Sequence, residues 1–375
     1  MRSMAVLAAI SVVALSCGGT ASSAGHSPIP SGSTGASAGP SAAPSGNPAA
    51  ASYGLLLTAG SLEMIAPNGT IAARAAVAAP SVHTCGQGTR AVLQPPVSAT
   101  ADKVYFRDGN TRIRYLTPDG KTGTATTVPG GASKISFFSV SPDDQRIAVL
   151  VEDLSPATKI NLSLYVEDLN GGRHHAVIYT SSAPKLKGGN TLWPMGWHDG
   201  ELVLAVWPPC TFEPAGLVPT EWHVANATTA VRLATIGSNQ CIPSYWPSPA
   251  GVACLDLGTH QATVYDWTGK ITLVAPTQAD DSQSGLSPSG RSIFYTPGVG
   301  IGAPPPSTRI VNLGPGPTAM VSGHAACLWI DEDHLLAPDA VIGFPSTTPG
   351  QGNVAASVTA LPASGECAGR FPGGL

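Results

Sequence analysis

Residues 134–179 read KISFFSV-SPDDQ-RIAVLVEDL-SPATKI-NLSLYVEDL-NGGR-HHAVIY. Four apolar runs of strand length are separated by a tight turn, a looser loop and a second tight turn. Pro142 fixes φ in the first turn, and Asn170-Gly171 in the second turn is a strong short-range signal for a β-hairpin. The stretch therefore predicts one four-stranded antiparallel unit.

Both turns of this unit recur along the chain. The first turn is repeated at 248–251 (SPAG) and 287–290 (SPSG), with looser copies near residues 100, 199 and 332. The spacing of these copies, roughly 40–55 residues with four strands in each period, is typical of a β-propeller. Copies of the second turn alternate with them, at 67–70, 118–121 and 267–270.

The repeat predicts an all-β chain folded as a β-propeller of four-stranded blades, with seven blades. A six-bladed ring with one irregular unit miscounted, or a pair of β-sandwiches, remains the alternative. The first unit starts at Tyr53 without an inner strand, so we expect a C-terminal strand such as 354–360 (VAASVTA) to pair with it and close the ring. The predicted blades cover 53–90, 91–131, 132–180, 190–238, 244–278, 281–324 and 325–369.

The central unit also resembles a known repeat. SPDDQRIAVLV (141–151) followed by LYVEDLNGG (164–172) is similar to the repeat of TolB-type propellers, which are WD-repeat-like. The resemblance covers one unit well and the others loosely. The chain has no room for the additional N-terminal domain of that family, and most copies of its SPD turn have lost part of the motif. The family's partnership with a peptidoglycan-associated lipoprotein is therefore not carried over.

The N-terminus reads as a targeting segment. Arg2 precedes a short apolar run from Met4 to Leu15, which is too short to span a bilayer and suits a secretory signal. The run ends at Ala14-Leu15-Ser16-Cys17, which resembles a bacterial lipobox. That resemblance implies cleavage before Cys17, lipidation of Cys17, for example with palmitate, and a place on the outer side of the cytoplasmic membrane. An ordinary secretory signal is the alternative.

The sequence predicts three regions. Residues 1–16 are the expected signal peptide, and residues 17–52 are the expected lipidated cysteine with its tether. Segment 18–50 is almost entirely Gly, Ser, Ala, Thr and Pro, so it buries too little apolar surface to fold. Residues 53–375 are the expected propeller.

Composition excludes several functions. Charged residues make up only 11% of the chain and the net charge is -4, so no basic stripe for nucleic acid is expected. An even number of cysteines outside the cytoplasm indicates disulfides, and the best single pair by position is Cys210–Cys241. No C-x-x-C spacing occurs, so neither a metal nor a cofactor is predicted. Apart from Cys17 the cysteines are Cys85, Cys210, Cys241, Cys254, Cys327 and Cys367.

The loops carry the functional hypothesis. In a four-stranded blade both tight turns lie on one face of the disc, and the longer connections lie on the other, where binding residues tend to gather. We expect a binding or scaffold module, tethered to the membrane by its lipid, that recognises an envelope protein, peptide or glycan. A hydrolase or lyase with a site at the channel mouth is the alternative. The candidate binding residues are Trp193, Trp207, Phe212, Glu213, Tyr245 and Trp246.

One acidic cluster is interpreted as structure. Asp331, Glu332, Asp333 and His334 could hold a cation, but they occupy the slot of the first turn of a blade. We therefore expect them to form that turn.

Overall fold

The computed structural model describes residues 51–84, 90–91, 96–185, 190–207, 219–237, 241–298, 305–346 and 352–375. They belong to one compact unit, Ala49–Leu375. The predicted signal peptide, Cys17 and most of the predicted tether lie outside the described residues. Within these ranges every regular element is a β-strand, and no helix that could cross a membrane occurs.

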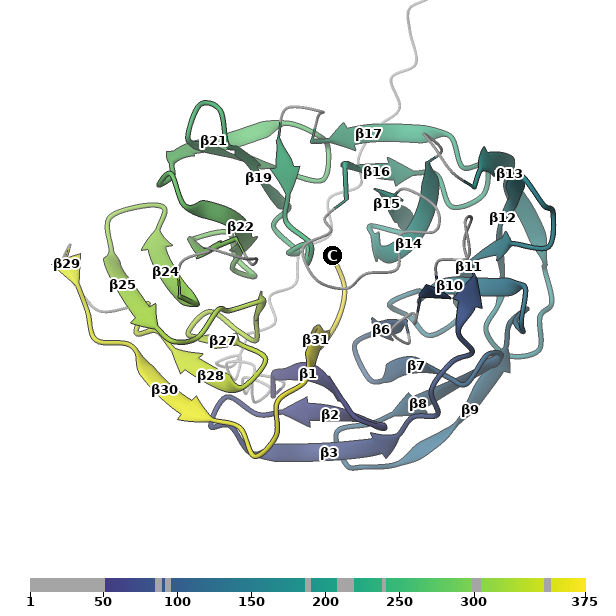
Figure 1. Ribbon diagram of the computed structural model, residues 1–375, viewed down its shortest axis with the longest axis horizontal. Coiled ribbons are helices and arrows are strands. Elements are labelled where there is room, and N and C mark those ends of the chain that lie inside the picture. Colours follow the sequence, from purple (N-terminus) through teal and green to yellow (C-terminus); the bar gives the residue numbers. More distant parts are fainter. Residues whose placement is uncertain are drawn as a thin grey trace, which may run out of the picture. The chain divides into compact units, whose positions relative to one another are not determined.

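Seven antiparallel sheets stand around a common centre (Figure 1), so the predicted seven-bladed β-propeller is confirmed. Each blade has four strands, ordered from the inside outward. Blade 1 contains β31 (Glu366–Phe371), β1 (Tyr53–Thr58), β2 (Ser61–Ile65) and β3 (Ile71–Ala76). Blade 2 contains β6 (Val97–Ala99), β7 (Val104–Asp108), β8 (Arg112–Leu116) and β9 (Thr122–Thr127). Blade 3 contains β10 (Lys134–Val140), β11 (Arg146–Asp153), β12 (Lys159–Asp168) and β13 (Ala176–Pro184).

The remaining blades follow the same plan. Blade 4 contains β14 (Thr191–His198), β15 (Glu201–Trp207), β16 (Glu221–Ala225) and β17 (Arg232–Ile236). Blade 5 contains β18 (Ile242–Pro243), β19 (Val252–Asp256), β20 (Gln261–Tyr265) and β21 (Ile271–Pro276). Blade 6 contains β22 (Asp281–Leu286), β23 (Ser292–Pro297), β24 (Ser307–Asn312) and β25 (Pro317–Ser322). Blade 7 contains β26 (Leu328–Trp329), β27 (His334–Leu336), β28 (Ala340–Gly343) and β30 (Ser357–Ala360).

Three short strands of the described ranges stand outside this plan. β29 (Gly352–Asn353) adds to the outer edge of blade 6 and runs parallel to β25. β4 (His83–Thr84) and β5 (Arg90–Ala91) pair with each other in the connection from blade 1 to blade 2.

The ring is closed by pairing of the first and last strands, as predicted. The register runs from Tyr53↔Phe371 to Leu57↔Glu366. The strand expected to do this was wrong: 357–360 is β30, which pairs with β28 as the outer strand of blade 7. Blade 7 needs that strand to complete its own sheet, so the last segment of the chain takes the inner place in blade 1.

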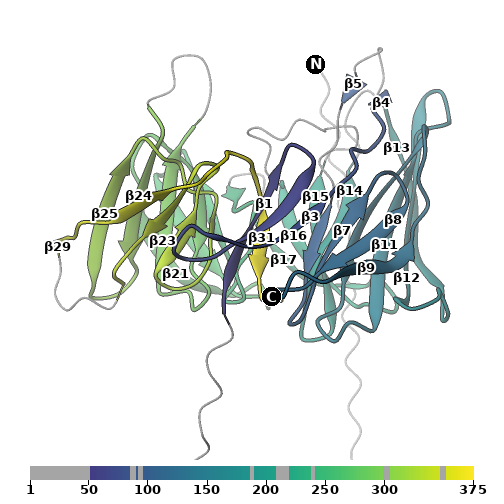
Figure 2. The ribbon, with the colours of Figure 1, turned by 90° about the horizontal axis from the view of Figure 1, so that it is seen from below.

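The disc has two different faces. The turns between the first two and last two strands of each blade lie on what we call the turn face, and the other connections lie on the loop face. β1 begins and β31 ends on the turn face, whereas β4 and β5 lie on the loop face (Figure 2). Beyond β31 the chain crosses toward blades 2 and 4, where Gly373 N–H donates to Thr100 O (2.8 Å) and Leu375 N–H to Trp197 O (3.2 Å).

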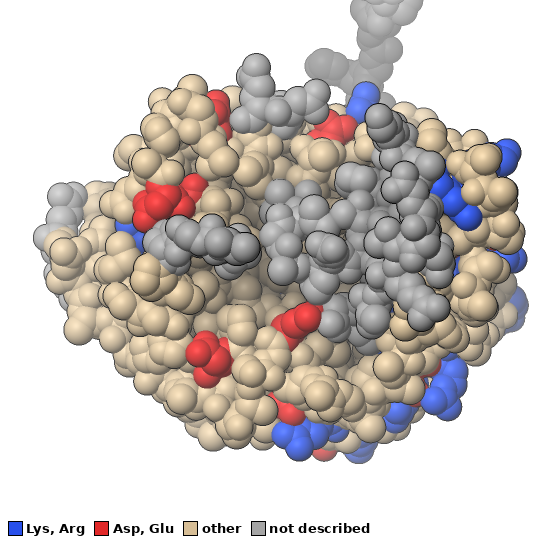
Figure 3. All heavy atoms as spheres, viewed as in Figure 1, with Lys and Arg blue, Asp and Glu red and all other residues tan. Residues whose placement is uncertain are grey.

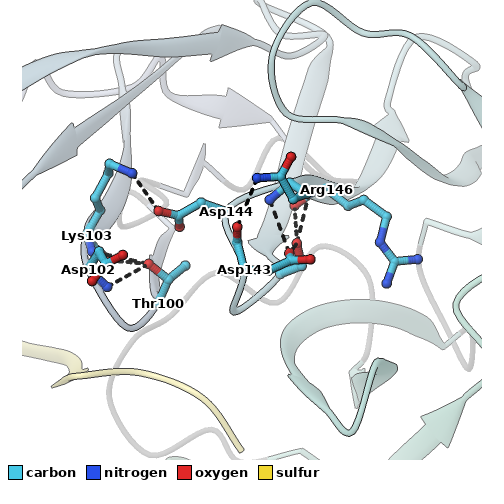
Figure 4. Close-up of polar contacts among 8 residues, drawn as sticks. Thr100, Asp102, Lys103, Asp143, Asp144 and Arg146 are labelled. Atoms are coloured by element: carbon cyan, nitrogen blue, oxygen red, sulfur yellow. Dashed lines mark hydrogen bonds and ion pairs between the residues drawn. The ribbon is translucent and has the colours of Figure 1, made fainter.

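The Ser-Pro turns close hairpins and also join blades. Ser141 Oγ accepts the N–H of Arg146 (2.9 Å), and Asp144 in the same turn adopts φ of 59°. The carboxylate of Asp144 then reaches Lys103 Nζ in the corresponding turn of blade 2 (2.5 Å, Figure 4). Ser248 Oγ likewise donates to a backbone carbonyl of the next turn, in blade 6 (2.7 Å).

The acidic cluster of blade 7 forms the turn that was predicted for it. Asp331 accepts a hydrogen bond from His334 Nδ1 (2.9 Å), and Asp333 accepts one from Ser346 Oγ (2.5 Å). Glu332 accepts the N–H of Ser289 (2.6 Å) and so joins the turns of blades 6 and 7. No group of side chains that could hold a metal ion occurs among the described residues.

Tryptophans join the blades through the core. Trp197, Trp222 and Trp329 are buried, and each indole N–H donates to a backbone carbonyl of a neighbouring blade's inner segment. A buried indole needs such a partner, because leaving the N–H unpaired would cost free energy. These bonds fix how adjacent sheets face one another.

Two disulfides lie in the described part of the chain. Cys241 is bonded to Cys254 inside blade 5, so the predicted pair Cys210–Cys241 was wrong. Cys241 precedes β18 and Cys254 lies within β19, with Cα atoms 5.4 Å apart, a span that suits a disulfide. Cys327 is bonded to Cys367, which joins blade 7 to β31. Cys85 and Cys210 lie outside the described residues.

Removing the Cys327–Cys367 disulfide will weaken the closed ring. Replacing both residues by Ala frees a 40-residue segment in the unfolded chain, and the expected loss is roughly 4 kcal/mol of unfolding free energy. Denaturant unfolding of the oxidised chain measures it. Ser364→Ala, an exposed change within the same segment, is the control and should have no effect. An unchanged unfolding midpoint in the double variant would contradict the assignment.

Candidate functional site

A row of stacked aromatic rings links blades 3, 4 and 5. The rings of Phe137 and Trp193 stack with centroids 3.9 Å apart, and those of Trp193 and Trp207 stack at 5.0 Å. Tyr245 meets Trp207 edge-on at 5.8 Å, and Trp246 meets Tyr245 edge-on at 4.8 Å. The last three contacts fall within the range of centroid distances that is favourable for aromatic pairs.

The row reaches the loop face at Trp207. Trp207 is the last residue of β15, and Trp193 lies near the start of β14, which is the same end of blade 4. Both rings are covered, with 4% and 7% of their surface exposed, whereas Tyr245 and Trp246 are half-buried. The structure thus brings together four of the predicted binding residues. The binding role itself stays a prediction.

The other two predicted residues, Phe212 and Glu213, lie outside the described residues. Their segment is bounded by Trp207 and by Thr220, whose N–H donates to the Val206 carbonyl (3.0 Å). The described strands therefore anchor both ends of this connection on the loop face, beside the aromatic row.

A small cavity lies at the other end of the row, near the turn face. Its volume is about 40 Å³, enough for a water molecule or one small chemical group. Trp246, Trp329 and Arg370 are among the residues that line it. Burial lowers the pKa of Arg370, and the nearby charge of Glu332 opposes that shift. Most of the lining residues are apolar or aromatic, and Arg370 is the one charged residue among them.

A buried carboxyl group lies beneath the row. Glu152 on β11 is 0% exposed, and the indole N–H of Trp193 donates to its Oε1 (3.2 Å). Burial raises the pKa of Glu152 to about 7, and the hydrogen bond from Trp193 partly opposes this. The group therefore changes charge close to neutral pH.

Sequence reasoning missed Phe137, Glu152 and Arg370. Phe137 and Glu152 belong to strands of the clearest repeat, where apolar and acidic residues look like ordinary strand composition. Arg370 lies in the closing strand, which was not predicted. Only the pairing of β31 with β1 brings it beside Trp246 and Trp329.

Comparisons with known proteins give no family. No protein-family model matches the chain, and no curated protein sequence matches it. Solved structures similar to it include an oligogalacturonate lyase in complex with manganese (12% identity, TM-score 0.42, covering 70% of this chain and 74% of that chain). A protein of unknown function from Bacteroides caccae is similar at 10% identity (TM-score 0.40, covering 70% and 90%). Dihydro-heme d1 dehydrogenase is similar at 12% identity (TM-score 0.42, covering 82% and 63%). Similarity at this level carries no information about ligand or reaction.

Neutralising Glu152 will stabilise the fold in a pH-dependent way. The folded-state pKa lies above the usual value of 4.5, so the favourable protonated form is lost as pH rises from about 4.5 through about 7. Glu152→Gln should therefore raise the melting temperature at pH 8 and change it little at pH 5. Asp280→Asn, at an exposed carboxylate, is the control. A shift that is equal at both pH values would contradict the burial argument.

Proposed function

We propose that this propeller is a binding or scaffold module on the outer side of the bacterial cytoplasmic membrane, anchored by a lipid on Cys17. Its ligand is an envelope protein, peptide or glycan, held by the loop face. The observation that carries the proposal is the aromatic row Phe137–Trp193–Trp207–Tyr245–Trp246, which reaches the loop face at Trp207, the last residue of β15. Aromatic residues are enriched where proteins bind partners.

The disulfides support a place outside the cytoplasm. Cys241–Cys254 and Cys327–Cys367 are the kind of bond that persists in oxidising compartments and is rare in the cytosol. The start of the propeller supports a loop face that points away from the membrane, because β1 begins on the turn face (Figure 2). The loop face is therefore opposite to the point where the predicted tether joins the disc.

An enzyme acting at the channel mouth is the second candidate. Glu152 favours it, because a carboxyl group with a pKa near 7 suits general acid or base catalysis. One fact weighs against it: Glu152 has no exposed surface. Binding is therefore the better supported function.

Removing the lipid site will release the protein. Cys17→Ala leaves no thiol for lipidation at the predicted cleavage point, so the chain should move from the membrane fraction to the soluble or secreted fraction. Fractionation followed by immunoblotting measures it. Ser16→Ala, which keeps both Cys17 and a small residue before it, should remain in the membrane fraction. Membrane retention of Cys17→Ala would contradict the anchor.

The connection after Trp207 should be needed for ligand capture. In the Cys17→Ala background, replacing residues 208–218 by a short Gly-Ser linker should reduce retention on isolated cell envelopes by about tenfold or more, which corresponds to about 1.4 kcal/mol. The control replaces 299–304, the equivalent connection of blade 6, in the same way. Equal retention of the two variants would contradict binding through this part of the loop face.

A further inference from the structure

Arg107 is a buried arginine that uses only part of its hydrogen-bonding capacity. It lies on β7, 1% exposed, on the side of blade 2 that packs against blade 3. Its Nη1 donates to the backbone carbonyl of Ser136 on β10 (2.8 Å). Its Nε and Nη2 are buried and have no hydrogen-bond partner among the described residues.

The two unpartnered nitrogens form one edge of the guanidinium plane. Their N–H groups point in the same direction, away from Nη1. This edge matches the two oxygens of a carboxylate or phosphate group, which arginine binds through two parallel hydrogen bonds. The free donors of Arg107 are thus arranged for a single bidentate oxyanion.

No acid in the described part of the protein fills this role. Burial lowers the pKa of Arg107 to about 10, and no carboxylate in the described ranges counteracts the shift. The carboxylate of the adjacent Asp108 forms ion pairs with Arg112 (2.6 Å) and Arg114 (3.5 Å). His83, also buried, adds no negative charge, and burial and the charge of Arg107 both lower its pKa.

Arg309, a second arginine in the interior of the ring, does have a carboxylate partner. It is nearly buried in blade 6, forms an ion pair with Asp281 and lies over the ring of Tyr295 at 4.3 Å. A buried charge normally has such a partner, because removing it from water unpaired is strongly unfavourable. Arg107 has no equivalent of Asp281 within the described ranges.

Arg107 lies near the loop face. Arg107 is the second-last residue of β7, and Ser136 lies near the start of β10, both at the loop-face ends of their strands. Val140, four residues after Ser136, directs its N–H to Ser98 Oγ on β6 (2.9 Å), so this edge of β10 faces the inner strand of blade 2. Lys and Arg side chains also lie along the rim of blades 2 and 3 (Figure 3).

We propose that Arg107 is the anchor of an anion-binding subsite between blades 2 and 3, which takes a carboxylate or phosphate group through Nε and Nη2. The subsite does not depend on the envelope role proposed above, because it rests on the unpaired edge of Arg107 alone. Ser136 holds the guanidinium in place through its carbonyl.

The test measures the melting temperature of the full chain in sodium acetate and in sodium phosphate, against sodium chloride at equal ionic strength. Acetate probes a carboxylate ligand and phosphate probes a phosphate ligand. We expect one of the two to stabilise the wild type in a saturable way, and Arg107→Met to lose that stabilisation. Arg107→Lys keeps the charge but loses the two-donor edge, so it should bind about tenfold more weakly or worse. Arg173→Met, at an exposed arginine, is the matched control and should behave as wild type.

The melting temperature of Arg107→Met is also informative without added acetate or phosphate. Arg107→Met removes an unpaired buried charge, so its melting temperature in chloride should equal or exceed that of the wild type. The proposal is overturned if neither anion stabilises the wild type beyond chloride, or if Arg107→Met keeps the full stabilisation. It is also overturned if Arg107→Lys binds the anion as tightly as the wild type, because the bidentate edge would then play no part.

Discussion

Closure of the ring is the constraint on which this structure depends. A blade has an open edge until its neighbours and its own four strands are in place, and blade 1 obtains its inner strand only from the end of the chain. β31 pairs with β1, and the Cys327–Cys367 disulfide holds it against blade 7. Gly54 on β1 allows close packing there, because a Cβ at this position would lie 3.0 Å from Leu336 of blade 7. Leu56, Ile330 and Leu336 fill the same seam. The two ends of the propeller thus form one core.

Much of this fold could be predicted because the signals are local. A Ser-Pro turn or an Asn-Gly turn depends on a few neighbouring residues, and their regular alternation identified seven blades. The closing strand and the disulfides could not be predicted in the same way, because both depend on partners that short-range patterns do not identify. VAASVTA looked more like a strand than GECAGRF, yet only the sheet of blade 7 decides where each one pairs. Cys241 likewise finds its partner in the adjacent strand, which position along the chain did not reveal.

The candidate site was predicted in its residue types and less well in its geometry. Four of the predicted aromatics do meet, because two lie on the paired strands β14 and β15 of blade 4 and two follow β18 of blade 5. No local pattern indicated that Trp193 and Trp207 would be covered. Glu152 and Arg107 were not singled out at all. Each is one charged residue in an ordinary strand, and its unusual state arises from burial between two blades. Such groups become visible only when the neighbouring sheet is in place.

Hydrogen–deuterium exchange of the Cys17→Ala chain, with and without isolated cell envelopes, tests the central claim most directly. The strands of the propeller, including β31, should exchange slowly in both states because the ring is closed. The account predicts that envelopes slow exchange at the loop-face strand ends around Thr191–Trp193 and Trp207, and leave the turns at 141–146 and 287–292 unchanged. Unchanged exchange at these strand ends, or protection confined to the turn face, would contradict it.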